Sequence, residues 1–198
     1  MRCRYRRYYR YHRSLRLWRK RAAAASETRV DDARLRRFEE TFLPHMNAAH
    51  NLARWLMRSD EDAQDVVQES YLRAFRFFET WQGGDGKAWL LTIVRNTSRT
   101  FHERRSRQGE AVLFDETVHA AEASHERSAA DTDDMRILKA CIEKLPAEFR
   151  EVLILREIEE MSYREIAEVT GLAMGTVMSR LSRARRSVAE CAGGKGVR

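Results

Sequence analysis

Residues 162–186 read SYREIAEVTGLAMGTVMSRLSRARR, and their pattern predicts two short helices joined by a tight turn. Ser162 and Glu165 form the pattern of a capping box at the start of the first helix. Gly171 can take the left-handed conformation in which helices often end. In the second helix, from about residue 174 to 189, apolar residues recur at i, i+4, i+7 and i+11: Val177, Leu181, Ala184 and Val188. This layout is typical of a helix-turn-helix, whose second helix enters the major groove of duplex DNA.

The side of the second helix that faces away from this apolar stripe is polar and basic. Arginine can pair with guanine through two hydrogen bonds, and serine can bond to base edges or phosphates. We expect DNA contacts from Thr176, Met178, Ser179, Arg180, Ser182, Arg183 and Arg186. The simpler interpretation is an ordinary helical hairpin with a solvated basic face. The capping box, the glycine turn and the apolar spacing agree with one another, which favours the DNA-binding motif.

Four segments of the chain carry a family resemblance. The segments LPAEFREVLILREIEEMSYREIAEVTGL and GTVMSRLSRAR resemble region 4 of bacterial RNA polymerase sigma factors. The segments DAQDVVQESYLRAF and KAWLLTIVRNTSR resemble region 2. Their order and spacing are similar to the extracytoplasmic-function (ECF) group of the sigma-70 family, over about residues 35–107 and 135–188. The further domain that primary sigma factors carry between these regions is absent, which supports the ECF group.

Two positions of the second helix depart from the family pattern. Met178 stands where Lys or Arg is usual, and Ser182 stands where a larger side chain is frequent. The resemblance therefore implies one charged contact fewer and an altered preference at the minus-35 promoter element.

The helical spacings and the resemblance together imply an all-α fold of two small helical domains joined by a flexible linker. We expect the region 2-like domain over residues 31–108 and the helix-turn-helix domain over residues 135–190. Residues 109–134 are acidic and weakly periodic, and they are interpreted as the linker. The Arg-rich extension over residues 1–30 and the residues 191–198 are expected to be disordered, although residues 1–21, in which Arg alternates with Tyr and Trp, could also bind phosphates and stack on bases.

The resemblance implies that the first domain docks on the largest subunit of the polymerase. Asp65, Gln68 and Glu69 match the positions that carry this contact. They are spaced i, i+3 and i+4, so that an acidic and amide stripe can meet a basic coiled coil. From the spacing alone, a solvated helix face is the simpler interpretation.

By the same resemblance, the following loop and helix hold the minus-10 element as an open single strand. Trp81 is implied to line the pocket of a flipped base, Trp89 to assist strand opening, and Asn96 to contact a base or the backbone. Arg95 and Arg99 are implied to contact phosphates. Without the resemblance, both tryptophans would more often belong to a core.

The implied function is that of an ECF-type sigma factor, without catalytic activity or cofactor. It would bind core RNA polymerase, recognise the minus-35 and minus-10 elements of promoter DNA and promote strand opening; an anti-sigma factor is a further candidate partner. A stand-alone helix-turn-helix regulator remains an alternative, but it leaves the stripe and the tryptophans unassigned. An enzyme is a third class, and His45 and His50 lack the spacing of an HExxH zinc motif.

Charge and cysteine content agree with this interpretation. The net charge is +7 and the isoelectric point is near 9.7, which suits a polyanionic partner. Cys3, Cys141 and Cys191 form no CxxC pair, so we expect no disulfide and no zinc site, as in a reducing cytoplasm. No apolar run approaches the ~18 residues of a membrane span, so no membrane insertion is expected.

Overall fold

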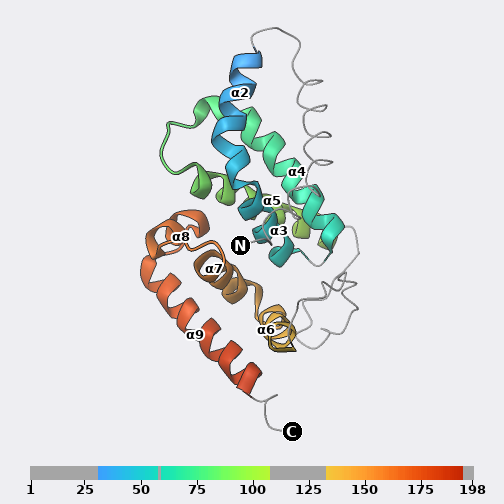
Figure 1. Ribbon diagram of the computed structural model, residues 1–198, viewed down its shortest axis with the longest axis vertical. Helices are drawn as coiled ribbons and strands as arrows, with labels where there is room; N and C mark the ends of the chain where they lie inside the picture. The colour runs from blue at the N-terminus through green and yellow to red at the C-terminus, as the bar shows by residue number, and fades with distance from the viewer. Residues whose placement is uncertain (1–30, 58, 108–132, 194–198) are drawn as a thin grey trace.

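The computed structural model describes residues 31–57, 59–107 and 133–193, and every regular element in these ranges is a helix (Figure 1). This confirms the predicted all-α class. The first group, called the N-terminal module, contains α2 (Asp31–Phe42), the 3-10 helix η1 (Leu43–His45), α3 (Met46–Leu56), α4 (Asp60–Phe77), the 3-10 helix η2 (Phe78–Thr80) and α5 (Gly86–Arg107). The second, called the C-terminal module, contains α6 (Asp133–Glu143), α7 (Ala147–Glu157), α8 (Tyr163–Thr170) and α9 (Met174–Gly193).

Two boundaries differ from the sequence-based expectation. Helix α6 begins at Asp133, inside the predicted linker, because Asp133 and Asp134 place negative charge in its first turn, where the helix dipole favours acids. Helix α9 continues to Gly193, inside the predicted disordered tail. The predicted Arg-rich extension, most of the linker and the last five residues lie outside the described ranges.

Aromatic packing builds the core of the N-terminal module. Phe38 and Phe42 of α2 are fully buried and pack edge-on against Phe78 of η2. The buried Tyr71 hydroxyl donates a hydrogen bond of 2.9 Å to the Phe42 carbonyl, which fixes the end of α2 on α4. Burial raises the pKa of Tyr71 well above its usual range, so the hydroxyl remains a donor.

The helix-turn-helix forms as its sequence predicts. The Ser162 hydroxyl accepts a hydrogen bond from the Glu165 amide, and the Glu165 carboxylate accepts one from the Ser162 amide. These bonds lower the pKa of Glu165, the largest cause being the bond with the Ser162 side chain. Gly171 ends α8 in the left-handed conformation with φ of 68°. Val177, Leu181 and Ala184 of α9 are buried, and Val188 is half-buried.

The expectation of no disulfide is wrong for this structure. Cys141 of α6 and Cys191 of α9 form a disulfide with their Cα atoms 5.7 Å apart. Sequence spacing did not reveal the pair because the two residues are 50 positions apart and meet only when α6 packs on α9. The bond fastens the end of α9 to α6, the first helix of the module.

We expect Cys191→Ser to lower the free energy of unfolding by about 2 kcal/mol under oxidising conditions, because the bond no longer restricts the unfolded chain. The estimate is at the low end of the usual range since Cys191 lies near the end of α9, where helices fray. Urea unfolding with and without a thiol reductant measures it. With reductant the variant and the parent should be equally stable; an equal loss in both conditions would assign the effect to packing instead.

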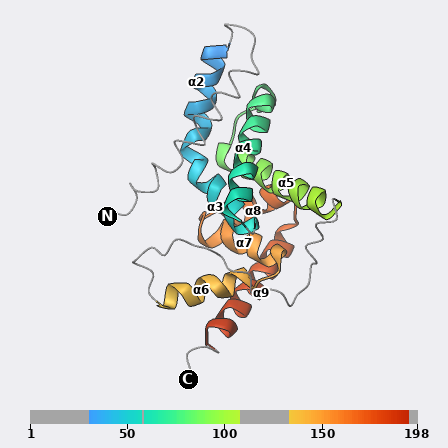
Figure 2. The same ribbon diagram turned by 90° about the vertical axis from the view of Figure 1, so that its right-hand side faces the viewer.

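The two modules pack directly against each other. Helix α3 lies on α7 and α5 lies on α8, and the buried apolar residues of both modules form one continuous cluster. Figures 1 and 2 show α2 and the end of α4 at one end of the molecule, with α6 and the end of α9 at the other. The periodicity of the sequence predicted both modules but not this contact.

Candidate polymerase and promoter interfaces

The stripe predicted to dock on polymerase lies on the solvent side of α4. Ser59 caps this helix, its hydroxyl accepting a hydrogen bond from the Asp62 amide at 3.0 Å. Asp65 and Glu69 are exposed and Gln68 is half-buried. The opposite side of α4 is buried in the core: Ala63, Val66, Val67, Ser70, Tyr71 and Ala74. The spacing of the sequence therefore places the three polar side chains together on an open face.

The two tryptophans predicted to handle the open strand lie in one aromatic cluster. The ring centroids of Trp81 and Trp89 are 6.3 Å apart, and each packs on Phe42, at 5.3 and 5.1 Å. Both are half-buried, so each serves the core and still reaches the surface. A hollow of about 320 Å³ opens beside Trp81. It is lined by Arg37, Glu40, Thr41, Phe78, Glu79, Trp81 and Gly83.

Helix α2 contributes a wall of this hollow that sequence reasoning missed. Arg37 lies 3.4 Å from the Glu79 carboxylate, and its guanidinium stands over the Phe78 ring at 5.7 Å. The exposed loop after Trp81 turns through Gly83 and Gly84, whose φ values of 88° and 98° favour glycine. No local motif marks Arg37, because it lines the hollow only when α2 packs beside η2.

Helix α5 divides its predicted DNA contacts between two environments. Asn96 and Arg99 are exposed. Arg95 is not: its Nε donates a hydrogen bond of 2.6 Å to Oε1 of Glu151 in α7, and the two side chains are only 13% and 9% exposed. The guanidinium predicted to hold a phosphate is therefore paired with a carboxylate of the other module.

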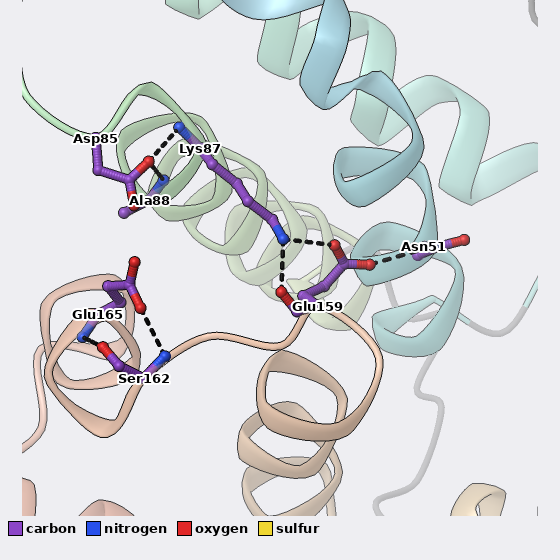
Figure 3. Close-up of polar contacts among 7 residues, drawn as sticks. All are labelled: Asn51, Asp85, Lys87, Ala88, Glu159, Ser162 and Glu165. Atoms are coloured by element: carbon purple, nitrogen blue, oxygen red, sulfur yellow. Dashed lines mark hydrogen bonds and ion pairs between the residues drawn. The ribbon is translucent and has the colours of Figure 1, made fainter.

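A second ion pair joins the modules at the start of α5 (Figure 3). Lys87 Nζ lies 3.1 Å from the Glu159 carboxylate and donates a hydrogen bond of 2.6 Å to the Glu159 carbonyl. The Asn51 amide donates to the other carboxylate oxygen of Glu159 at 3.1 Å. The Glu159 side chain is 6% exposed. We call the pairs Arg95–Glu151 and Lys87–Glu159 the latch.

The two acids of the latch were not predicted as functional residues. Glu151 stands directly before the buried run Val152–Leu155 of α7, and Glu159 follows the end of that helix. A carboxylate among core positions requires a partner, because burying an unpaired charge is costly. The sequence shows the two glutamates on either side of an apolar run, which is the signal that they need partners. It does not show which residues those partners are.

Helix α9 exposes most of the side chains that the sequence predicted as minus-35 contacts. Met178, Ser179, Ser182, Arg183 and Arg186 are exposed, and Thr176 is half-buried. Arg180 is the exception, because its guanidinium lies 2.9 Å from the Glu148 carboxylate of α7 and its side chain is 24% exposed. The structure therefore gives Arg180 a partner within the C-terminal module.

The described part of the chain offers neither a cluster of metal ligands nor a helix suited to the membrane. It contains no group of three or more His, Cys, Asp or Glu side chains that could hold a metal ion. Among its helices, none combines the length and the apolar character needed to cross a membrane.

Known proteins match both modules. The family model described as Sigma-70 region 2 matches residues 41–108, and that described as Sigma-70, region 4 matches residues 135–188. The ECF RNA polymerase sigma factor SigE of Mycolicibacterium smegmatis is 33% identical over 160 residues, covering 80% of this chain and 62% of the relative. The ECF RNA polymerase sigma-E factor of Haemophilus influenzae is 32% identical over 148 residues, covering 69% of this chain and 77% of the relative.

Two solved structures share the fold. The sigma factor RpoE of Bartonella quintana, solved in complex with the anti-sigma factor NepR, gives a TM-score of 0.67 at 30% identity and covers 78% of this chain and 95% of that chain. CnrH in complex with the cytosolic domain of CnrY gives a TM-score of 0.57 at 24% identity and covers 91% of this chain and 98% of that chain. This chain spans less than two thirds of the mycobacterial relative but about three quarters of the Haemophilus one. With both regions matched in order, the chain belongs to the extracytoplasmic-function group of RNA polymerase sigma factors.

Proposed function

We propose that this chain brings core RNA polymerase to promoters and opens them. Asp65, Gln68 and Glu69 bind the polymerase, α9 binds the minus-35 element as duplex, and the hollow beside Trp81 receives a base of the minus-10 strand. The observation that carries the proposal is that one chain exposes all three surfaces: the α4 stripe, the hollow beside Trp81 and the basic face of α9. A stand-alone DNA-binding regulator would need only the last.

The chemistry of each surface fits its assigned ligand. Half-buried aromatic rings can stack on an unpaired base, a contact of roughly 1–3 kcal/mol per base. The exposed amide of Asn96 can bond to a base edge, and the exposed Arg99 can hold a phosphate. The function requires no catalytic group in this chain, and it places the protein with the polymerase in the cytoplasm.

The packed arrangement of the modules is a closed form that has to open on the promoter. The two elements lie roughly 25 base pairs apart, which at about 3.4 Å per base pair is on the order of 85 Å of duplex. In the closed form α5, which carries Asn96 and Arg99, packs on α8, the helix that precedes α9, and we infer that the modules separate to reach both elements. The α4 stripe stays exposed in this form. We therefore infer that polymerase docks first and that the latch opens afterwards.

An anti-sigma factor is a second partner that we propose for this chain. The support is that RpoE and CnrH, which share its fold, were solved with the anti-sigma factor NepR and with the cytosolic domain of CnrY, respectively. A protein that holds the modules together would keep the latch closed.

Run-off transcription with core polymerase on a genomic DNA library tests the function. Transcripts that start at defined sites only when the chain is added would support it, and would give the promoter sequence as well. Retention on DNA without any polymerase binding would favour the stand-alone regulator.

Arg183→Ala should weaken promoter binding roughly tenfold and relax the preference at one minus-35 position, because a bidentate Arg–guanine pair discriminates by about 1–3 kcal/mol. Competition binding with a panel of single-base variants measures both effects. Arg136→Ala removes an exposed guanidinium from α6 and serves as the matched control. An equal loss of affinity on every sequence would identify Arg183 as a phosphate contact.

A further inference from the structure

Helix α9 exposes two methionines where it begins. Met174 is 50% exposed and Met178 is 47% exposed. They are four residues apart, so they lie on the same side of the helix. The same ridge continues at four-residue intervals through Ser182 and Arg186, both exposed. An apolar pair therefore starts a ridge that ends in an arginine.

Packing within the protein does not account for this pair. The side of α9 that packs on the module is formed by Val177, Leu181 and Ala184, all buried. Met178 follows Val177 directly and is rotated by about 100° from it around the helix axis. Half of each methionine side chain therefore remains in water, although contact with another apolar group would be favourable.

The position of the pair indicates what that apolar group is. In a helix-turn-helix, the N-terminal residues of the recognition helix contact the base edges. Met174 is the first residue of α9 and Met178 lies one turn later. Among the base-edge groups of the major groove, the C5-methyl group of thymine is the apolar one. Methionine is flexible and polarizable, so its side chain can adapt to such a methyl group.

We propose that Met178, supported by Met174, reads a thymine methyl group in the minus-35 element. The proposal rests on the proposed function, which places α9 in the major groove of that element. The partner that covers the two exposed methionines is then duplex DNA, and the neighbouring Arg183 and Arg186 contact guanine or phosphate. Where an arginine or lysine would favour guanine, Met178 favours the base that carries a methyl group.

The expected discrimination is modest and measurable. Burying one methyl-sized group contributes about 0.8 kcal/mol, which corresponds to roughly a fourfold change in affinity. Removing that one methyl group from DNA should therefore weaken binding about fourfold. The effect should disappear in Met178→Ala, because the variant has no side chain to contact the methyl group.

The experiment selects minus-35 sequences with the full chain and core polymerase from a randomised duplex library. The preferred duplex is then made again with deoxyuridine in place of each thymine in turn, which deletes only the methyl group. The affinities for the thymine duplex and for each deoxyuridine duplex are measured with the parent, with Met178→Ala and with Met178→Lys. Met135→Ala is the matched control, since Met135 is 55% exposed but lies on α6.

The result that supports the proposal is a fourfold loss at one thymine for the parent and for Met135→Ala, with none for Met178→Ala. Met178→Lys should move the preference at that position towards guanine. A selected sequence whose thymines tolerate deoxyuridine would overturn the proposal while leaving the proposed function intact; the pair would then be assigned to a protein partner. If no sequence is enriched at all, the proposed function itself fails.

Discussion

Replacing Asp65 and Gln68 with Ala is expected to abolish association with core polymerase while leaving the helical content unchanged. Asp65 is exposed and Gln68 is half-buried, and neither is among the buried core residues of α4. Removing one partner of a charge pair that is buried in an interface typically costs 2–5 kcal/mol of binding free energy. The affinity should therefore fall by about thirtyfold to several thousandfold.

Fluorescence titration with core polymerase measures this loss, and circular dichroism checks the fold. The matched control is the double variant Asn47→Ala and Glu103→Ala, which removes one amide and one carboxylate from exposed positions on α3 and α5. The control should bind like the parent. If the Asp65 and Gln68 variant still binds, the docking surface lies elsewhere on the molecule.

The parts of this fold that the sequence predicted are those set by neighbouring residues. The capping box at Ser162, the left-handed Gly171 and the buried stripe of α9 each depend on residues within a few turns of one another. Local hydrogen bonds and helical periodicity decide such features. The same reasoning placed Asp65 and Glu69 together on an exposed face, because helical spacing alone determines which side chains share a face.

The parts that could not be predicted depend on residues that are distant in the chain. Cys141 and Cys191 are separated by 50 positions, and Arg95 and Glu151 by 56. No periodic pattern connects such pairs. The consequence for the site is specific: an arginine assigned to a phosphate from its place on α5 is paired with a carboxylate of α7 in the closed form. For Trp81 and Trp89 the sequence left two interpretations, a core position or a pocket for a base. In the structure the two are compatible, because both rings pack on Phe42 and remain half-buried.

Glu151→Gln is expected to open the latch. The substitution keeps the shape of the side chain but leaves the Arg95 guanidinium without a counter-charge at a site that is 13% exposed. Removing one partner of a buried ion pair typically costs 3–5 kcal/mol, and only the closed form bears this cost because Arg95 is solvated when the modules separate. The equilibrium between closed and open forms should shift by about a hundredfold or more towards the open form.

Two measurements report on the separation of the modules. Small-angle X-ray scattering should give a larger radius of gyration for Glu151→Gln than for the parent. Binding of a single-stranded minus-10 oligonucleotide should strengthen, by a factor limited by how much the closed form predominates in the parent. Glu148→Gln is the matched control, because it lies on the same helix but pairs with Arg180 inside the C-terminal module.

Arg95→Gln separates opening from DNA contact. This variant also removes the pair with Glu151, so its radius of gyration should increase as well. It lacks the guanidinium that we assign to a phosphate, so its affinity for the oligonucleotide should stay below that of Glu151→Gln. If Glu151→Gln remains as compact as the parent and binds the oligonucleotide no better, the ion pair does not restrain the modules. If both variants gain equally in affinity for the oligonucleotide, the ion pair does restrain the modules, but Arg95 does not contact the DNA.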